Sequence, residues 1–151
     1  MKFIHPAVMI GFFYFLYLQL VLGRKIQNLK EKSPEFVQRP NLLETHKTYG
    51  YALCGVCLAG LFGGIWLTAS VLGAQLPFQQ TYGHGFFGSL ILACLVMSAV
   101  LGLSIKHVVK PKIRDRFMTF HANMVYIMGF FGILSLLTGL GVLIWGLSAV
   151  S

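Results

Sequence analysis

The stretch FFGSLILACLVMSAVLGLSI, residues 86–105, contains only glycine, serine and apolar residues. At 1.5 Å of rise per residue, an α-helix of this length spans about 30 Å, which is the thickness of the hydrocarbon core of a bilayer. A surface helix of a soluble bundle would carry a polar face at helical spacing, and this stretch has none. It therefore predicts a helix that crosses a membrane.

Three further blocks of the chain also lack Asp, Glu, Lys and Arg: Pro6–Leu22, Tyr49–Leu72 and Phe120–Ala149. Of the 151 residues 56% are hydrophobic and 11% are charged, and a soluble domain needs more polar surface than that. The first block is too long for a signal peptide and has no cleavage pattern, so we expect it to be retained as a span.

These blocks predict an all-α membrane protein: one four-helix up-down transmembrane bundle over residues 1–151. The expected spans are about 5–23, 46–73, 84–106 and 117–149. The pattern Asn41-x-x-Glu44 resembles a capping box and predicts that the second helix begins near Leu42. Pro111 is expected in the first turn of the fourth helix.

The basic residues predict the orientation of the bundle. Nearly all of them lie in two loops, which carry Arg24, Lys25, Lys30, Lys32, Arg39 and Lys47 in the first, and Lys106, Lys110, Lys112, Arg114 and Arg116 in the second. By the positive-inside rule both loops face the cytoplasm or its plastid equivalent, and both termini face the outer (lumenal or periplasmic) side. The net charge of +8 is then a topology signal rather than a nucleic-acid-binding patch, since no domain would present such a patch.

Four of the five histidines lie near the N-terminal end of four different predicted helices: His5, His46, His84 and His121. Because the helices alternate in direction, His5 and His84 share the outer level, and His46 and His121 share the inner level. Helices one and three, like helices two and four, are diagonal in an up-down bundle. Two imidazoles that face each other across its core can bind one haem iron from both sides. We therefore expect these four histidines to be the metal ligands of two haem b groups, one near each membrane face.

Other residues fit this interpretation. Gly50 and Gly88 lie one turn after His46 and His84 on the same helix faces, where a haem needs room. Lys47 and Arg116 are expected to pair with the haem propionates at the inner level. The fifth histidine, His107, has no partner in this scheme and is expected at the surface or near a propionate.

The four histidines and the topology resemble the ascorbate-reducible di-haem cytochromes b of membranes. That family uses four core helices with one axial histidine each, paired first with third and second with fourth. The resemblance implies haem b as cofactor and electron transfer across the membrane as function. The chain lacks the additional flanking helices of that family.

A second resemblance covers nearly the whole chain. It rests on His5-Pro6, Gly23-Arg24, His46 with Gly50, His84 with Gly88, and Arg116…His121-x-Asn123. These features are similar to an uncharacterised four-span family of cyanobacteria and plastids that is regarded as cytochrome-b-like. This likeness implies the thylakoid or plasma membrane of a phototroph.

The resulting hypothesis is an electron-transfer protein, rather than a self-contained enzyme, whose partners are a donor and an acceptor such as a quinone, ascorbate or a redox protein. A rival hypothesis is a structural or assembly subunit of a larger photosynthetic membrane complex or of a homo-oligomer, in which the histidines either lie at interfaces or each ligate the magnesium of a chlorophyll. A third is a one-haem protein that uses only His46 and His121.

Overall fold

The computed structural model describes residues 4–29, 34–72, 81 and 83–148. Within these residues there are four α-helices and no strand: α1 (Ile4–Asn28), α2 (Arg39–Leu72), α4 (His84–Ile105) and α5 (Pro111–Ser148). A short 3-10 helix, η1 (Pro34–Gln38), directly precedes α2. Each α-helix is long and apolar enough to cross a membrane. The predicted all-α multi-pass membrane architecture is confirmed.

At the ends that carry the basic loops, α1, α2 and α5 extend beyond the predicted spans, whereas α4 ends at Ile105, one residue before its predicted end. α1 continues to Asn28, and α2 begins at Arg39 rather than near Leu42, so Asn41 lies inside the helix and caps nothing. Pro40 is tolerated there because the N–H groups of the first helical turn have no acceptor within the helix, so the N–H that proline lacks is not needed. Pro111 opens α5 as predicted, for the same reason. The expected ends of the second and fourth spans, at 73 and 149, lie outside the described residues.

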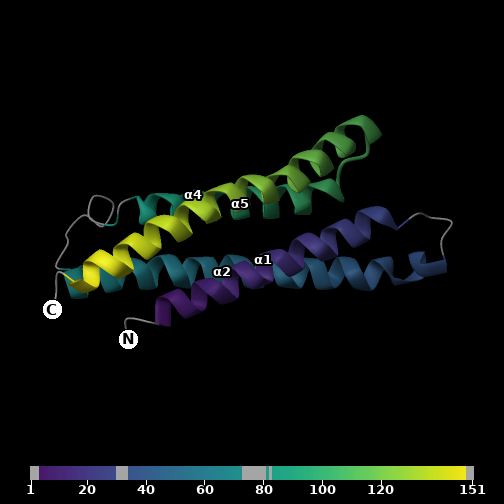
Figure 1. Ribbon diagram of the computed structural model, residues 1–151. Coiled ribbons are helices and arrows are strands. Elements are labelled where there is room, and N and C mark those ends of the chain that lie inside the picture. Colours follow the sequence, from purple (N-terminus) through teal and green to yellow (C-terminus); the bar gives the residue numbers. More distant parts are fainter. Residues whose placement is uncertain (1–3, 30–33, 73–80, 82, 149–151) are drawn as a thin grey trace.

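The helices form an up-down bundle in which sequence neighbours are also neighbours in space (Figure 1). α1 packs on α2, α2 on α4 and α4 on α5, while α5 closes on α1 only lightly. Consequently α1 lies diagonally from α4, and α2 lies diagonally from α5. α1 begins and α5 ends at the same end of the bundle, and the two loops that carry the basic residues lie at the other end.

A small apolar core lies midway along the helices. Its best-buried members are Phe12, Leu53, Ile91 and Met128, one from each helix, all at most 2% exposed. Each follows the first histidine of its own helix by seven residues, which is about two turns, so core residue and histidine share one helix face. Leu16, Cys57 and Leu95 extend this core.

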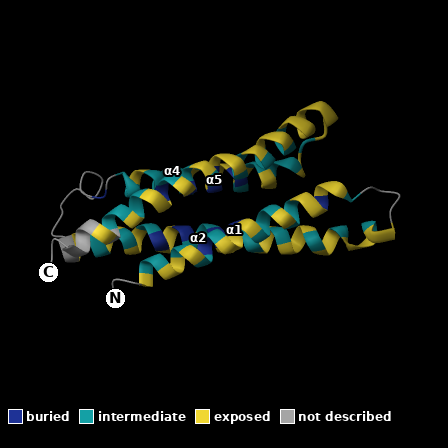
Figure 2. Cartoon of the chain, in the orientation of Figure 1, coloured by how far each residue is buried: buried dark blue, intermediate teal, exposed yellow. Residues whose placement is uncertain are grey.

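The outer surface of the bundle is apolar. Large side chains such as Ile10 (68% exposed) and Phe130 (60% exposed) point away from the core, and exposed residues line the outside of every helix in Figure 2. A surface of this kind is stable when lipid covers it, because the backbone polar groups are satisfied within each helix.

Candidate functional site: two histidine pairs

The structure brings four histidines together in two pairs, each across a diagonal of the bundle. The ring centroids of His5 on α1 and His84 on α4 are 5.9 Å apart, with the ring planes at 87°. The centroids of His46 on α2 and His121 on α5 are also 5.9 Å apart, with the planes at 70°. These are the pairs that the alternation of helix direction predicts. All four side chains are half-buried.

The separation within each pair suits a metal ion held between two imidazoles. A metal–nitrogen bond to imidazole is about 2 Å long, so two rings on opposite sides of one metal have their centroids roughly 6 Å apart. Both pairs have this spacing. In the described part of the chain no group of three or more His, Cys, Asp or Glu side chains is placed to hold a metal ion. Each level therefore offers two imidazoles, which is the number of axial ligands in a bis-histidine haem.

Hydrogen bonds fix the proton of His84 on the nitrogen that faces away from such a metal. Its Nδ1 lies 2.8 Å from the backbone carbonyl oxygen of Ser135 on α5, and the Ser135 hydroxyl is 3.2 Å from the same nitrogen. A carbonyl oxygen only accepts, so Nδ1 carries the hydrogen and Nε2 keeps its lone pair. Metal-binding histidines commonly have this arrangement, in which a second group orients the ring and raises the basicity of the ligating nitrogen.

His121 repeats this arrangement at the other level. Its Nδ1 lies 2.8 Å from the carbonyl oxygen of Ser98 on α4 and 3.1 Å from the Ser98 hydroxyl. No hydrogen bond within the described residues engages Nε2 of His84 or His121, so these two nitrogens are available as ligands.

A glycine on the neighbouring helix makes room for each imidazole ring. A methyl group at Gly139 would lie 2.9 Å from Cε1 and Nδ1 of His84, and one at Gly102 would lie 3.3 Å from Cε1 of His121. The corresponding distances are 3.3 Å from Gly64 to His5 and 3.4 Å from Gly23 to His46. For His84 and His121, the carbonyl that accepts from Nδ1 belongs to the residue four positions before the glycine. Because the glycine has no Cβ one turn later, that carbonyl is open to a second hydrogen bond.

These four glycines form a repeat that the sequence analysis missed. Each follows the histidine of its own helix by 18 residues, in the pairs His5/Gly23, His46/Gly64, His84/Gly102 and His121/Gly139. Eighteen residues are five full turns of α-helix, so the two residues share one face and lie about 27 Å apart along the axis. In an antiparallel hairpin of two such helices, each histidine meets the glycine of the other. The signal was present in the sequence as a fixed spacing in all four spans.

The two glycines that were predicted to make room for a haem have different surroundings. A methyl group at Gly50 would lie 3.1 Å from Nε2 of Gln19, so α1 fills the space beside Gly50. A methyl group at Gly88 would have no atom of another residue within 4 Å among the described residues. Of the two, only Gly88 borders open space.

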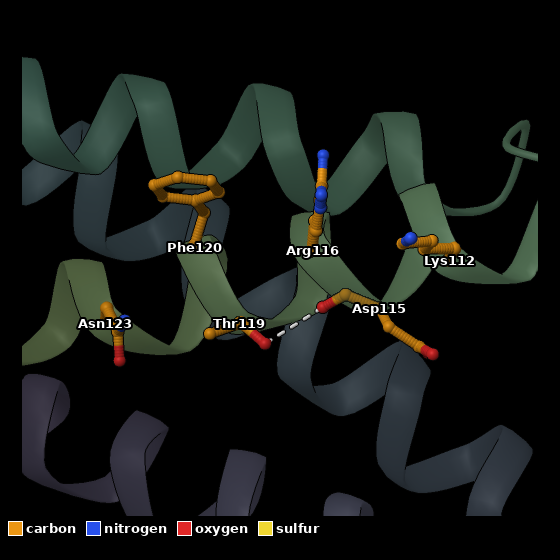
Figure 3. A pocket seen from close by; sticks show the side chains of 6 residues that line it. All are labelled: Lys112, Asp115, Arg116, Thr119, Phe120 and Asn123. Atoms are coloured by element: carbon orange, nitrogen blue, oxygen red, sulfur yellow. Dashed lines mark hydrogen bonds between the residues drawn. The ribbon is translucent and has the colours of Figure 1, made fainter.

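The basic residues expected near the His46–His121 pair lie at its end of the bundle but not against the rings. Lys47 forms an exposed ion pair with Glu44, at 3.1 Å. Arg116 is exposed and lines an open depression on α5 together with Lys112, Asp115, Thr119, Phe120 and Asn123 (Figure 3). His107 is exposed beyond the end of α4 and joins neither pair. Arg24, which follows Gly23, donates a hydrogen bond of 2.9 Å to the Tyr126 hydroxyl and so ties α1 to α5.

The chain matches no protein-family model, no curated protein and no solved structure. The functional conclusion therefore depends on the geometry of the histidine pairs.

Proposed function

We propose that the chain is a transmembrane b-type cytochrome that binds two haem b groups and carries electrons between the two faces of a membrane. His5 and His84 hold one haem, and His46 and His121 hold the other. When bound, each haem supplies a one-electron redox couple, and the chain tunes its potential through the ligands, their hydrogen bonds and burial.

The observation that carries this proposal is the centroid separation of 5.9 Å in both pairs, together with the Nδ1–H···O=C bonds of His84 and His121. A histidine within a membrane span carries an energetic cost, and such residues are kept where they bind or react. In each pair one ring, that of His84 or of His121, has its hydrogen on Nδ1, so its Nε2 lone pair can bind an electron-pair acceptor that lies between the rings. A metal ion is such an acceptor, and the apolar walls of the bundle suit a porphyrin around it.

The remaining parts of the proposal follow from charge and from resemblance. The basic loops favour the cytoplasm or the plastid stroma for the His46–His121 end and the lumen or periplasm for the His5–His84 end. The likeness to the cyanobacterial and plastid family favours a thylakoid or plasma membrane of a phototroph. Exchange with a quinone, ascorbate or a redox protein would take place at the bundle ends, since the loops are too short to form a substrate domain.

The test is haem stoichiometry in the purified protein. We expect a pyridine haemochrome assay to give about two haem b per chain and dithionite to produce the sharp α-band of a b-type cytochrome. His84→Ala and His121→Ala should each remove about one haem, because each leaves a pair with a single ligand. His107→Ala is the matched control and should keep both.

Three results would contradict the proposal in different ways. A chain without any bound chromophore would leave only a structural or assembly role. A red chlorophyll band in place of the α-band would support the pigment hypothesis. One haem per chain that is unchanged in His5→Ala would restrict the site to His46 and His121.

A further inference from the structure

On α4 and α5, the residue 14 positions after the histidine contacts the imidazole of the neighbouring helix. These residues are Ser98 and Ser135, whose carbonyl and hydroxyl oxygens both lie near an imidazole Nδ1. On α1 the equivalent residue is Gln19, which faces His46.

His46 differs from His84 and His121, because its Nδ1 has no hydrogen-bond acceptor among the described residues. This nitrogen is buried and makes no hydrogen bond within the described part of the chain. It lies beside α1, 3.9 Å from the position of a methyl group on Gly23. If Nε2 of His46 binds iron, Nδ1 must carry the hydrogen, and a buried N–H without an acceptor is destabilising.

Gln19 on α1 carries an acceptor without a donor and also contacts His46. The amide Nε2 of Gln19 donates to the backbone carbonyl oxygen of His46 at 2.7 Å, in the notch that Gly50 leaves open. The amide oxygen Oε1 of Gln19 is buried and also unpaired among the described residues. Gln19 is one helical turn from Gly23, so the unpaired donor and the unpaired acceptor lie along the same short segment of α1.

We propose that Gln19 is the positioning residue for His46: its Oε1 accepts the hydrogen of His46 Nδ1, directly or through one bridging water. This inference rests on the proposed function, because it takes Nε2 of His46 as a ligand. A small rotation of the ring and of the amide about their terminal torsions satisfies both buried groups. Gln19 then forms two hydrogen bonds with His46. The Gln19 Nε2 donates to the backbone carbonyl of His46, and the Gln19 Oε1 accepts from the His46 ring.

The bond has a predictable electronic effect. An acceptor on Nδ1–H increases electron donation from the ligating nitrogen and so favours ferric over ferrous iron. Removing the acceptor should raise the midpoint potential of the haem at the His46–His121 level and leave the other haem unchanged. The shift should change the ferrous-to-ferric ratio at fixed ambient potential by about tenfold at most, which corresponds to about 59 mV for a one-electron couple.

The experiment is a potentiometric titration of the purified protein, followed at the α-bands of the two haems. Gln19→Met keeps the length of the side chain and removes both polar atoms. We expect it to raise one midpoint and leave the second in place. Gln27→Met, the same substitution at an exposed position of α1, is the matched control and should leave both midpoints in place. Two unchanged midpoints in Gln19→Met, or equal shifts of both, would overturn the inference.

A second variant covers the case in which Gln19→Met loses haem instead of shifting its potential. Gln19→Glu, protonated in the apolar bundle, keeps a carbonyl oxygen as acceptor for Nδ1 and an O–H as donor to the His46 carbonyl, so it should restore the occupancy that Gln19→Met loses. Equal loss in both variants would overturn the role of Oε1. Wild-type protein without haem would refute the proposed function itself, whereas two haems with unresponsive midpoints would refute only the role of Gln19.

Discussion

At the residue scale, the site depends on glycines that lack a side chain as well as on the histidines that they contact. The imidazole of His84 lies against the backbone of α5 at Gly139, where any side chain would occupy the position of the ring. The same glycine leaves the Ser135 carbonyl open as the acceptor for Nδ1. Because Gly139 carries no side chain, the His84 ring has room beside α5, and its Nδ1 can reach the carbonyl that determines its tautomer.

We expect Gly139→Ala to displace the His84 ring and to weaken haem binding at the His5–His84 level by about tenfold or more, the usual effect of disturbing the group that orients a ligand. Gly129→Ala on the same helix is the control: a methyl group there meets nothing within 4 Å, and both variants gain the same helix propensity. Haem content per chain measures the effect. Full haem content in Gly139→Ala would show that the close approach is not required.

At the element scale, each helix is the same unit: a histidine, a buried residue two turns later, and a glycine five turns later. In α1 these are His5, Phe12 and Gly23. All three lie on one face because 7 and 18 residues are close to whole numbers of turns. The buried residues of the four helices meet midway between the two histidine levels, so the core that holds the bundle together also separates the two sites.

Phe12 is 0% exposed and is the largest side chain of this core. We expect Phe12→Ala to lower the free energy of unfolding by about 3 kcal/mol, because the cavity it leaves loses close contacts from all sides. Phe130→Ala removes the same atoms from a side chain that is 60% exposed, and its effect should stay below about 1 kcal/mol. Thermal unfolding in one detergent compares the two. Equal melting temperatures of the two variants would show that the burial of Phe12 contributes little to the stability of the bundle.

At the scale of the whole molecule, two antiparallel hairpins, α1–α2 and α4–α5, pack so that each histidine pair joins one hairpin to the other. Within a hairpin, the histidine of each helix meets the glycine of its neighbour. Between hairpins, α1 is paired with α4, and α2 is paired with α5, through the imidazoles. A metal ion in each pair would thus link the two hairpins near both ends.

The bundle geometry and the charge pattern together predict one orientation. Val37 lies in η1, directly before α2, and Val109 lies between α4 and α5; they are 83% and 92% exposed. Ile4 begins α1, at the opposite end of the bundle (Figure 1). In intact cells or right-side-out vesicles, a membrane-impermeant maleimide should label Ile4→Cys but neither Val37→Cys nor Val109→Cys, and inverted vesicles should reverse the result. The unmodified chain gives the background from its three native cysteines. The reverse labelling pattern would place the basic loops outside.

The sequence alone predicts four spans, their alternating direction and therefore the pairing of the histidines by depth, because hydrophobic length and loop length are local properties of the chain. It also contains the 18-residue spacing from His84 to Gly102 and in the other three helices, although that spacing acquires a meaning only when the neighbouring helix is known. The tertiary structure decided which face of each helix meets which neighbour. It showed that Gly139 and its equivalents, rather than Gly50, make room for the rings, that Ser98 and Ser135 set the tautomers, and that Gln19 faces His46. These contacts join residues far apart in the chain. Which residues meet depends on how the side chains of two helices pack against each other, and the sequence of one helix alone does not determine that packing.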